Sequence, residues 1–180
     1  MGIRTAAESP PPLLFLVVLG GRAEGAHIEL HDVRFVAGDT LEATLPTLRR
    51  QWFGRRRGLH IDSYMAVRQV GSFTVELRRE PFQGAERLWF VNVGGYQPHL
   101  LAEEHAFTLE VATTAAGAKQ MALGHCLPEA LSRHKDDLQA LEAVDDCLPL
   151  MAVEGWQVHL LPATEPAPPL RPDWFGYRPI

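Results

Sequence analysis

The chain repeats itself at a fixed spacing of 74 residues, and this self-similarity limits the folds that it can adopt. At this spacing, Gly20-Gly21 aligns with Gly94-Gly95 without a gap, and four polar residues align in the same register. The aligned polar pairs are Glu29 with Glu103, His31 with His105, His60 with His134, and Asp62 with Asp136. The second copy then carries an insertion, after which residues 156–160 match residues 73–77. The sequence therefore predicts two degenerate copies of one unit.

Each copy opens with two predicted strands. The first is a continuous apolar run, at residues 13–19 and again at 88–93, as expected for a buried strand. We expect it to end at the Gly-Gly pair, because glycine adopts backbone angles that other residues resist. In the second strand, at residues 31–36 and 105–111, apolar residues alternate with polar ones, which is typical of a half-buried strand.

A helix should follow the two strands in each copy. In the first copy Asp39 or Thr40 can cap it, and Pro46 suggests that the regular helix begins only near Thr44. Its apolar face consists of Leu41, Leu45, Leu48 and Trp52. The second helix is expected over residues 114–127, with an inward face of Ala118, Met121, Ala122 and Cys126.

Each copy ends in a predicted hairpin. The strands 65–70 and 73–77 flank Gly71-Ser72, and the strands 148–153 and 156–160 flank residues 154–155. Two-residue connections enforce antiparallel pairing. The predicted fold class is therefore α+β, with two tandem pseudo-symmetric ββαββ units packed together in a mainly antiparallel arrangement.

The expected boundaries follow from this pattern. They are a disordered N-terminal segment at 1–12, a first repeat at 13–80, a junction at 81–86, a second repeat at 87–161 and a Pro-rich C-terminal tail at 162–180. The tail ends in Trp174, Phe175 and Tyr177. Aromatic side chains seldom stay solvated, so we expect these three to dock onto the body of the protein.

Composition limits the partners and the cellular compartment that we expect for the protein. A formal net charge of -5 disfavours a nucleic-acid partner. The apolar run at 13–19 is too short to span a bilayer and has a counterpart in mid-chain, so we interpret it as a strand rather than a leader, and we expect no membrane association. The chain has two cysteines, Cys126 and Cys147, and such sparse usage fits a reducing compartment better than a disulfide-bonded secreted protein. The sequence thus predicts a cytoplasmic protein.

Several short motifs of the chain match the pattern of one known family. They are Gly20-Gly21, His31-Asp32-Val33, His60 to Ser63, Gly94-Gly95-Tyr96, Glu103 and His105, His134 to Asp137, Val144 to Cys147, and Gly176 to Ile180. With these motifs the chain resembles a bacterial domain of unknown function, family number 1543, in which one or two copies occur per protein. The resemblance spans most of residues 13–180 and departs from the family pattern in the residues between Asp137 and Val144 and at Trp156, where tyrosine is expected. It implies bacterial origin and a two-copy layout, and it transfers no reaction, ligand or catalytic residue.

The repeated polar set is the candidate site. Its members are Glu29, His31, His60, Asp62, Glu103, His105, His134 and Asp136. Imidazole and carboxylate ligands together suit zinc, manganese or iron(II), and the same groups could perform acid–base chemistry. Such residues also satisfy backbone groups at strand starts and turns, which would make the set structural. The residues alone do not identify a cofactor or decide between these roles.

Three other features of the sequence are weaker candidates for a functional site. Acidic neighbours disfavour a reactive thiolate at Cys147, and a Gly-Gly pair without further glycines does not define a phosphate site. The arginines at 49–50 and 55–57 match a solvated helix end. The leading interpretation is a non-catalytic structural or interaction module with a protein partner or a second copy. The alternatives are a metal or small-ligand binder that uses the duplicated pairs and, behind it, a His/carboxylate enzyme.

Overall fold

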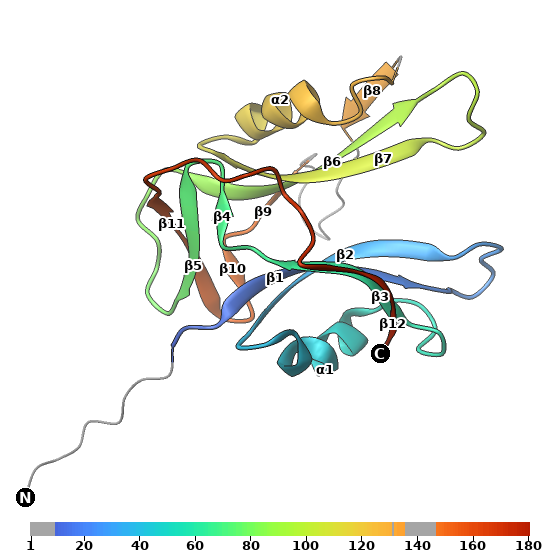
Figure 1. Cartoon of the computed structure of the whole chain (residues 1–180), viewed down its shortest axis with the longest axis horizontal. Helices are drawn as coiled ribbons and strands as arrows, with labels where there is room; N and C mark the ends of the chain where they lie inside the picture. The colour runs from blue at the N-terminus through green and yellow to red at the C-terminus, as the bar shows by residue number, and fades with distance from the viewer. Residues whose placement is uncertain (1–9, 131, 136–146) are drawn as a thin grey trace, which may run out of the picture.

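The computed structural model describes residues 10–130, 132–135 and 147–180 and shows an α+β protein whose strands pair antiparallel (Figure 1). Most of the predicted disordered segment at 1–12 lies outside the described residues, as does Asp136. Within the described part of the chain, no helix is both long and apolar enough to cross a membrane.

The first sheet has the strand order β12-β3-β1-β2. Its strands are β1 (Leu13–Gly21), β2 (Leu30–Gly38), β3 (His60–Ala66) and β12 (Trp174–Pro179). β1 is central and is buried on both faces, which explains why its sequence is continuously apolar instead of alternating. β2 lies at one edge and β12 at the other.

The second sheet is built around β6 (Arg87–Tyr96), with β7 (Glu104–Ala112) on one side. The short strands β8 (Ser132–Lys135) and β9 (Leu148–Pro149) pair with β6 on its other side. β6 is also buried on both faces, so the two continuous apolar runs of the sequence occupy matching positions in the two sheets.

A bridging sheet joins the two halves, with the order β10-β11-β5-β4. β4 (Gln69–Val70) and β5 (Phe73–Arg78) come from the first half, while β10 (Ala152–Val153) and β11 (Trp156–Pro162) come from the second. β5 pairs with β11 over six residues, so each half completes the sheet of the other. Neither half therefore has this sheet by itself.

The sheets and helices form layers around three clusters of buried side chains. The first and second sheets face each other, with the bridging sheet at one end, and α1 (Leu41–Gln51) and α2 (Ala115–His125) cover their outer faces (Figure 1). A shared core between the sheets includes Leu16, Leu77 and Phe90. A second cluster lies between the first sheet and α1, and a third lies between the second sheet and α2.

The helices agree with the predicted positions but differ in two details. Thr40 caps α1 by accepting from the Ala43 N–H, so the helix begins at Leu41 and runs through Pro46, and the expected start near Thr44 is wrong. In α2, Ala118, Ala122 and Cys126 are buried as expected. Met121 was expected inward but is exposed, because the small residues bring the helix backbone close to the sheet and leave Met121 at the margin.

Both predicted hairpin turns are confirmed, whereas the strands leading into them are interrupted. Val70 pairs with Phe73 across Gly71-Ser72, and Val153 pairs with Trp156 in the second half. The predicted strand 65–70 divides between β3 and β4, and the predicted strand 148–153 divides between β9 and β10. The interruption lets the chain leave one sheet and enter the bridging sheet.

Two of the three C-terminal aromatics, Trp174 and Tyr177, contact the body of the protein as expected. Phe175 was also expected to dock, but it lies on the edge strand β12 and is 77% exposed. β12 pairs with β3, and the Trp174 ring stacks on Tyr64 with ring centroids 6.2 Å apart. The Asp173 carboxylate accepts from the Ala66 N–H at 2.8 Å, which anchors the start of β12. The last strand of the chain thereby becomes an edge of the first sheet.

Candidate functional site

A row across the first sheet positions the two histidines of the first half. In the strand register, Gly20 on β1 pairs with His31 on β2 on one side and with His60 on β3 on the other. Paired residues point to the same face of a sheet, so both imidazoles project over Gly20. A Cβ at Gly20 would overlap the imidazole of His60 and would lie 3.0 Å from the Asp62 Oδ2 atom. The missing side chain makes room for the polar cluster.

This role corrects the prediction made for the Gly-Gly pairs. β1 ends at Gly21, the second glycine of the pair Gly20-Gly21, as expected, and β6 ends at Tyr96, directly after Gly94-Gly95. The expectation of unusual backbone angles is wrong. None of these four residues has a positive φ. Their small size is what the fold uses, because a Cβ at Gly21 would also come within 2.8 Å of the Trp52 indole.

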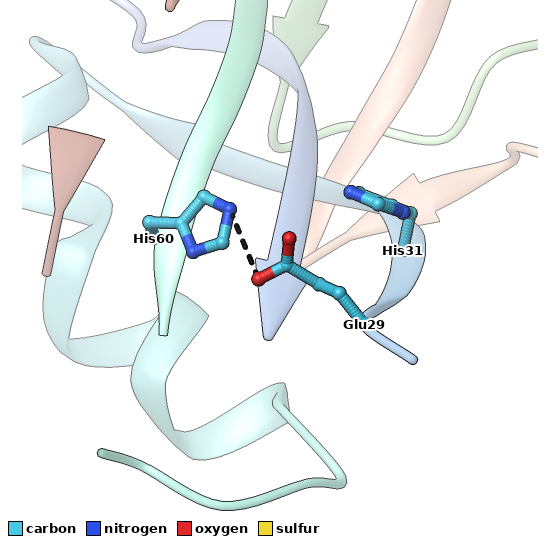
Figure 2. A group of neighbouring side chains, drawn as sticks. All are labelled: Glu29, His31 and His60. Carbon is cyan, nitrogen blue, oxygen red and sulfur yellow. Dashed lines mark ion pairs between the residues drawn. The ribbon is translucent and has the colours of Figure 1, made fainter. Parts of the chain in front are cut away.

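All four candidate residues of the first half come together. Asp62 bridges the two histidines, with its Oδ2 atom 3.0 Å from His31 Nε2 and its Oδ1 atom 3.1 Å from His60 Nε2. Glu29, in the loop before β2, places its Oε1 atom 3.6 Å from His60 Nε2. Figure 2 shows the Glu29 carboxylate pointing at the His60 ring, with the His31 side chain beside it. His60 and Asp62 both lie on β3.

The orientation of His60 is defined on every side. Its ring is buried, with a side-chain exposure of 1%, and its Nδ1 atom lies 2.9 Å from the carbonyl oxygen of Gly58. A carbonyl only accepts, so Nδ1 carries the proton and donates. The Tyr177 ring of β12 covers the imidazole at a centroid distance of 4.1 Å. His60 Nε2 is therefore directed at the carboxylates of Glu29 and Asp62.

Three of these side chains lie close enough together to hold a metal ion. Glu29, His31 and His60 each offer one ligand atom, and the three atoms lie within 4.8 Å of one another. Glu29 and His31 are exposed to solvent while His60 is buried, so a cation could enter from one side and be held from the other. A histidine whose second nitrogen donates to a backbone carbonyl is the usual arrangement for a metal-ligating imidazole.

The second half repeats part of this arrangement. Gly94 on β6 pairs with His105 on β7 and with His134 on β8, as Gly20 pairs with His31 and His60. Glu103 lies with its Oε2 atom 3.8 Å from His105 Nε2 and accepts from the Tyr96 hydroxyl at 3.2 Å. Tyr96 was not among the predicted site residues. The His134 side chain and Asp136 lie outside the described residues.

A second polar cluster, missed at the level of the sequence, lies under the end of α2. Glu110 on β7 is buried, and its Oε1 atom is 3.1 Å from His125 Nε2 and 3.2 Å from the Thr108 hydroxyl. Burial raises the pKa of the Glu110 carboxyl, and His125 and Thr108 act against this rise. The 74-residue spacing could have identified Glu110 as a buried carboxylate. At this spacing Glu110 corresponds to Val36, which is fully buried in the first half.

This pKa shift predicts a pH-dependent stability difference for Glu110→Gln. Because the raised pKa belongs to the folded protein, ionised Glu110 costs stability. The cost is absent below the pKa of the unfolded chain and complete above that of the folded protein. The glutamine variant stays neutral, so its unfolding free energy should rise relative to that of the natural chain as the pH increases above about 4.3. Urea unfolding across a pH series measures the difference, with exposed Glu129→Gln as the control, and a falling difference would contradict the expectation.

Fold and site together define a small antiparallel α+β protein with a His/carboxylate cluster at one end of its first sheet. The family model described as Domain of Unknown Function (DUF1543) matches residues 26–77, a segment that contains Glu29, His31, His60 and Asp62, and the chain belongs to this family. The family description assigns no activity.

Comparison with solved structures gives a similar protein over nearly the whole length. The crystal structure of a protein Il1583 from Idiomarina loihiensis is 38% identical, with a TM-score of 0.70. The match covers 93% of this chain and 97% of that chain. No curated protein matches the chain.

Proposed function

We propose that the first half of this protein binds a divalent transition-metal cation through Glu29, His31 and His60. Asp62 contacts the Nε2 atoms of both histidines. Because His60 would bind the cation through the same Nε2 atom, Asp62 would serve as a fourth ligand. Two imidazoles with one or two carboxylates form a ligand set that suits zinc, manganese or iron(II). The role proposed is binding, and no residue is assigned to catalysis.

One observation carries this proposal, namely the direction of His60 Nε2. Because Nδ1 donates to Gly58, a neutral His60 would present an Nε2 lone pair to two carboxylates, which is repulsive in a buried position. Either a second proton or a bound cation resolves the conflict. A cation also accounts for the convergence of Glu29 and His31 on the same point, which a protonated His60 does not require.

A purely structural cluster is the alternative interpretation. In it, an imidazolium at His60 would hydrogen-bond to Asp62, and the cluster would fasten β2 to β3 across Gly20. That arrangement would serve a non-catalytic structural or interaction module. It predicts a protein whose stability does not respond to metal or chelator, so one experiment separates the two roles.

Elemental analysis and thermal unfolding test the proposal on protein purified without a histidine tag. We expect near-stoichiometric metal. A chelator should lower the melting temperature by about 5–10 °C, since a ligand at a hundred times its Kd stabilises by about 2.7 kcal/mol. His31→Ala should abolish the shift, and Asp62→Asn should weaken metal binding about 10–100-fold. His27→Ala, an exposed histidine in the same loop, is the control. A metal-free protein whose melting temperature does not change with chelator would contradict the proposal.

We further propose that the chain is a tandem duplication of one ββαββ unit with pseudo-two-fold symmetry. Support comes from the equivalent pairings of Gly20 and Gly94 with two histidines each, and from the pairing of β5 with β11 between the halves. In this proposal the copies span 13–80 and 87–161, with a junction at 81–86. Residues 162–180 return across the molecule to the first copy.

A cytoplasmic location and a protein partner or second copy also stand as proposals. The two cysteines are buried, which suits a reducing compartment, and the net charge of -5 supports the absence of a nucleic-acid partner. Exposed apolar side chains at Ile28, Leu100 and Leu101 in the loops after β1 and β6 support an interaction surface. Sedimentation of the natural chain and of Leu101→Ser would reveal a second copy as a lower mass in the variant.

A further inference from the structure

A cleft with a cavity volume of about 450 Å³ lies at the edge of the second sheet that β7 forms, whereas the His60 row lies in the first sheet. It opens between β7, the end of α2 and the Pro-rich segment 167–170. This size is within the range of sites for small molecules. Its apolar wall is formed by Val70, Phe107, Leu109, Pro168, Pro169 and Leu170.

Glu110 and His125 supply the charged groups of the cleft. The Glu110 side chain is 9% exposed, whereas that of His125 is 56% exposed and reaches over the carboxylate from the last turn of α2. No lysine or arginine is among the described residues that line the cleft. A buried carboxylate therefore lines a mainly apolar cleft, and the side chain that pairs with it is more than half exposed to solvent.

Core packing does not require this carboxylate. The corresponding residue of the first half, Val36, is fully buried and packs in the cluster under α1. Burying a carboxylate in the same place costs free energy unless a cation or hydrogen-bond donor compensates it. His125 compensates it only partly, because the pKa of Glu110 remains raised by burial. A ligand that brings a positive charge would complete the pairing.

We propose that this cleft binds a small molecule with a primary ammonium group and an apolar body. The ammonium would pair with the Glu110 carboxylate in place of His125, and the apolar body would lie against Phe107, Pro168 and Pro169. An ammonium has three donors for a carboxylate, which only accepts. Carboxylate ligands are disfavoured because they would face Glu110. This inference does not depend on the metal proposal.

Three probes of one shape but different charge test the inference. Benzylamine is cationic, benzyl alcohol is neutral and benzoate is anionic, and binding of each is measured by NMR titration of the full-length protein. We expect benzylamine to bind about tenfold or more tightly than either of the others. Benzoate binding as tightly as benzylamine, or the absence of any benzylamine binding, would overturn the inference.

Variants of the two charged residues complete the test. Glu110→Gln has nearly the same shape and should weaken benzylamine binding about tenfold or more, while Glu129→Gln, an exposed glutamate beyond α2, should leave it unchanged. His125→Ala should retain or strengthen binding because it uncovers the carboxylate. Circular dichroism verifies that each variant is folded. Unchanged binding in Glu110→Gln, or lost binding in His125→Ala, would contradict the assignment of Glu110 as the partner of the amine.

Discussion

Replacing Leu77 by alanine is expected to lower the free energy of unfolding by about 2–5 kcal/mol, the range for truncating a fully buried leucine. Leu77 is 1% exposed and lies on β5, opposite Val158 of β11, in the core that both halves share. The lost contacts thus belong to the first half and the second half alike. Urea unfolding followed by circular dichroism gives the magnitude.

The same variant tests whether the two halves fold as one. Because β5 and β11 belong to one sheet, the loss at Leu77 should shift a single cooperative transition seen equally by fluorescence and circular dichroism. Met151→Ala, at an exposed position outside the proposed interaction surface, is the control and should change stability by less than about 0.5 kcal/mol. Two separate transitions, of which Leu77→Ala moves only one, would show that the halves are independent.

Gly20→Ala should be the second most damaging change, although it adds only one methyl group. The new Cβ would overlap the His60 imidazole, which cannot withdraw easily because Gly58 holds its Nδ1 atom and Tyr177 covers its face. Overpacking of this kind costs about 1–3 kcal/mol. It should also displace His60 Nε2 from Glu29 and Asp62, so metal binding should be lost together with stability.

Gly124 provides a control, because its replacement by alanine should raise stability where that of Gly20 lowers it. A Cβ at Gly124 in α2 meets no atom within 4 Å, so Gly124→Ala should stabilise the protein by roughly 0.5–1 kcal/mol through helix propensity. Thermal unfolding and metal titration of both variants give the comparison. If Gly20→Ala binds metal as tightly as the natural chain and has the same melting temperature, the site does not require the close approach of Gly20 to His60.

Local chemistry explains why much of the fold could be predicted. The cap at Thr40, most of the apolar faces of the two helices and the two-residue turns depend on neighbours within a few positions, and the structure contains them. Pro46 misled the prediction of the helix start because the packing of Leu41 and Leu48 on the first sheet outweighs one missing backbone hydrogen bond.

Pairing between distant segments could not be predicted in the same way. The exchange of hairpins into a bridging sheet joins residues about eighty positions apart, and nothing in the hairpin sequence specifies which strand it meets. The predicted strand 65–70 therefore had to be divided between two sheets. Glu110 was overlooked because an isolated glutamate between apolar residues is typical of a solvated strand face, while the position of α2 above it is a tertiary fact.

The sequence by itself determined the repeat spacing, the two helices, the hairpin turns and the polar residues to examine, because these follow from spacing, periodicity and residue type along the chain. The strands β8 and β12 were not predicted, because each becomes a strand only through pairing with a distant segment. Only the tertiary structure decided that Glu29, His31, His60 and Asp62 of the first half meet around a glycine, and that Tyr177 covers His60 from the C-terminal strand. The physical reason is strand register. Which residues face each other across a sheet depends on hydrogen bonds between strands and on burial of shared apolar surface, and both are settled only when the whole chain has packed.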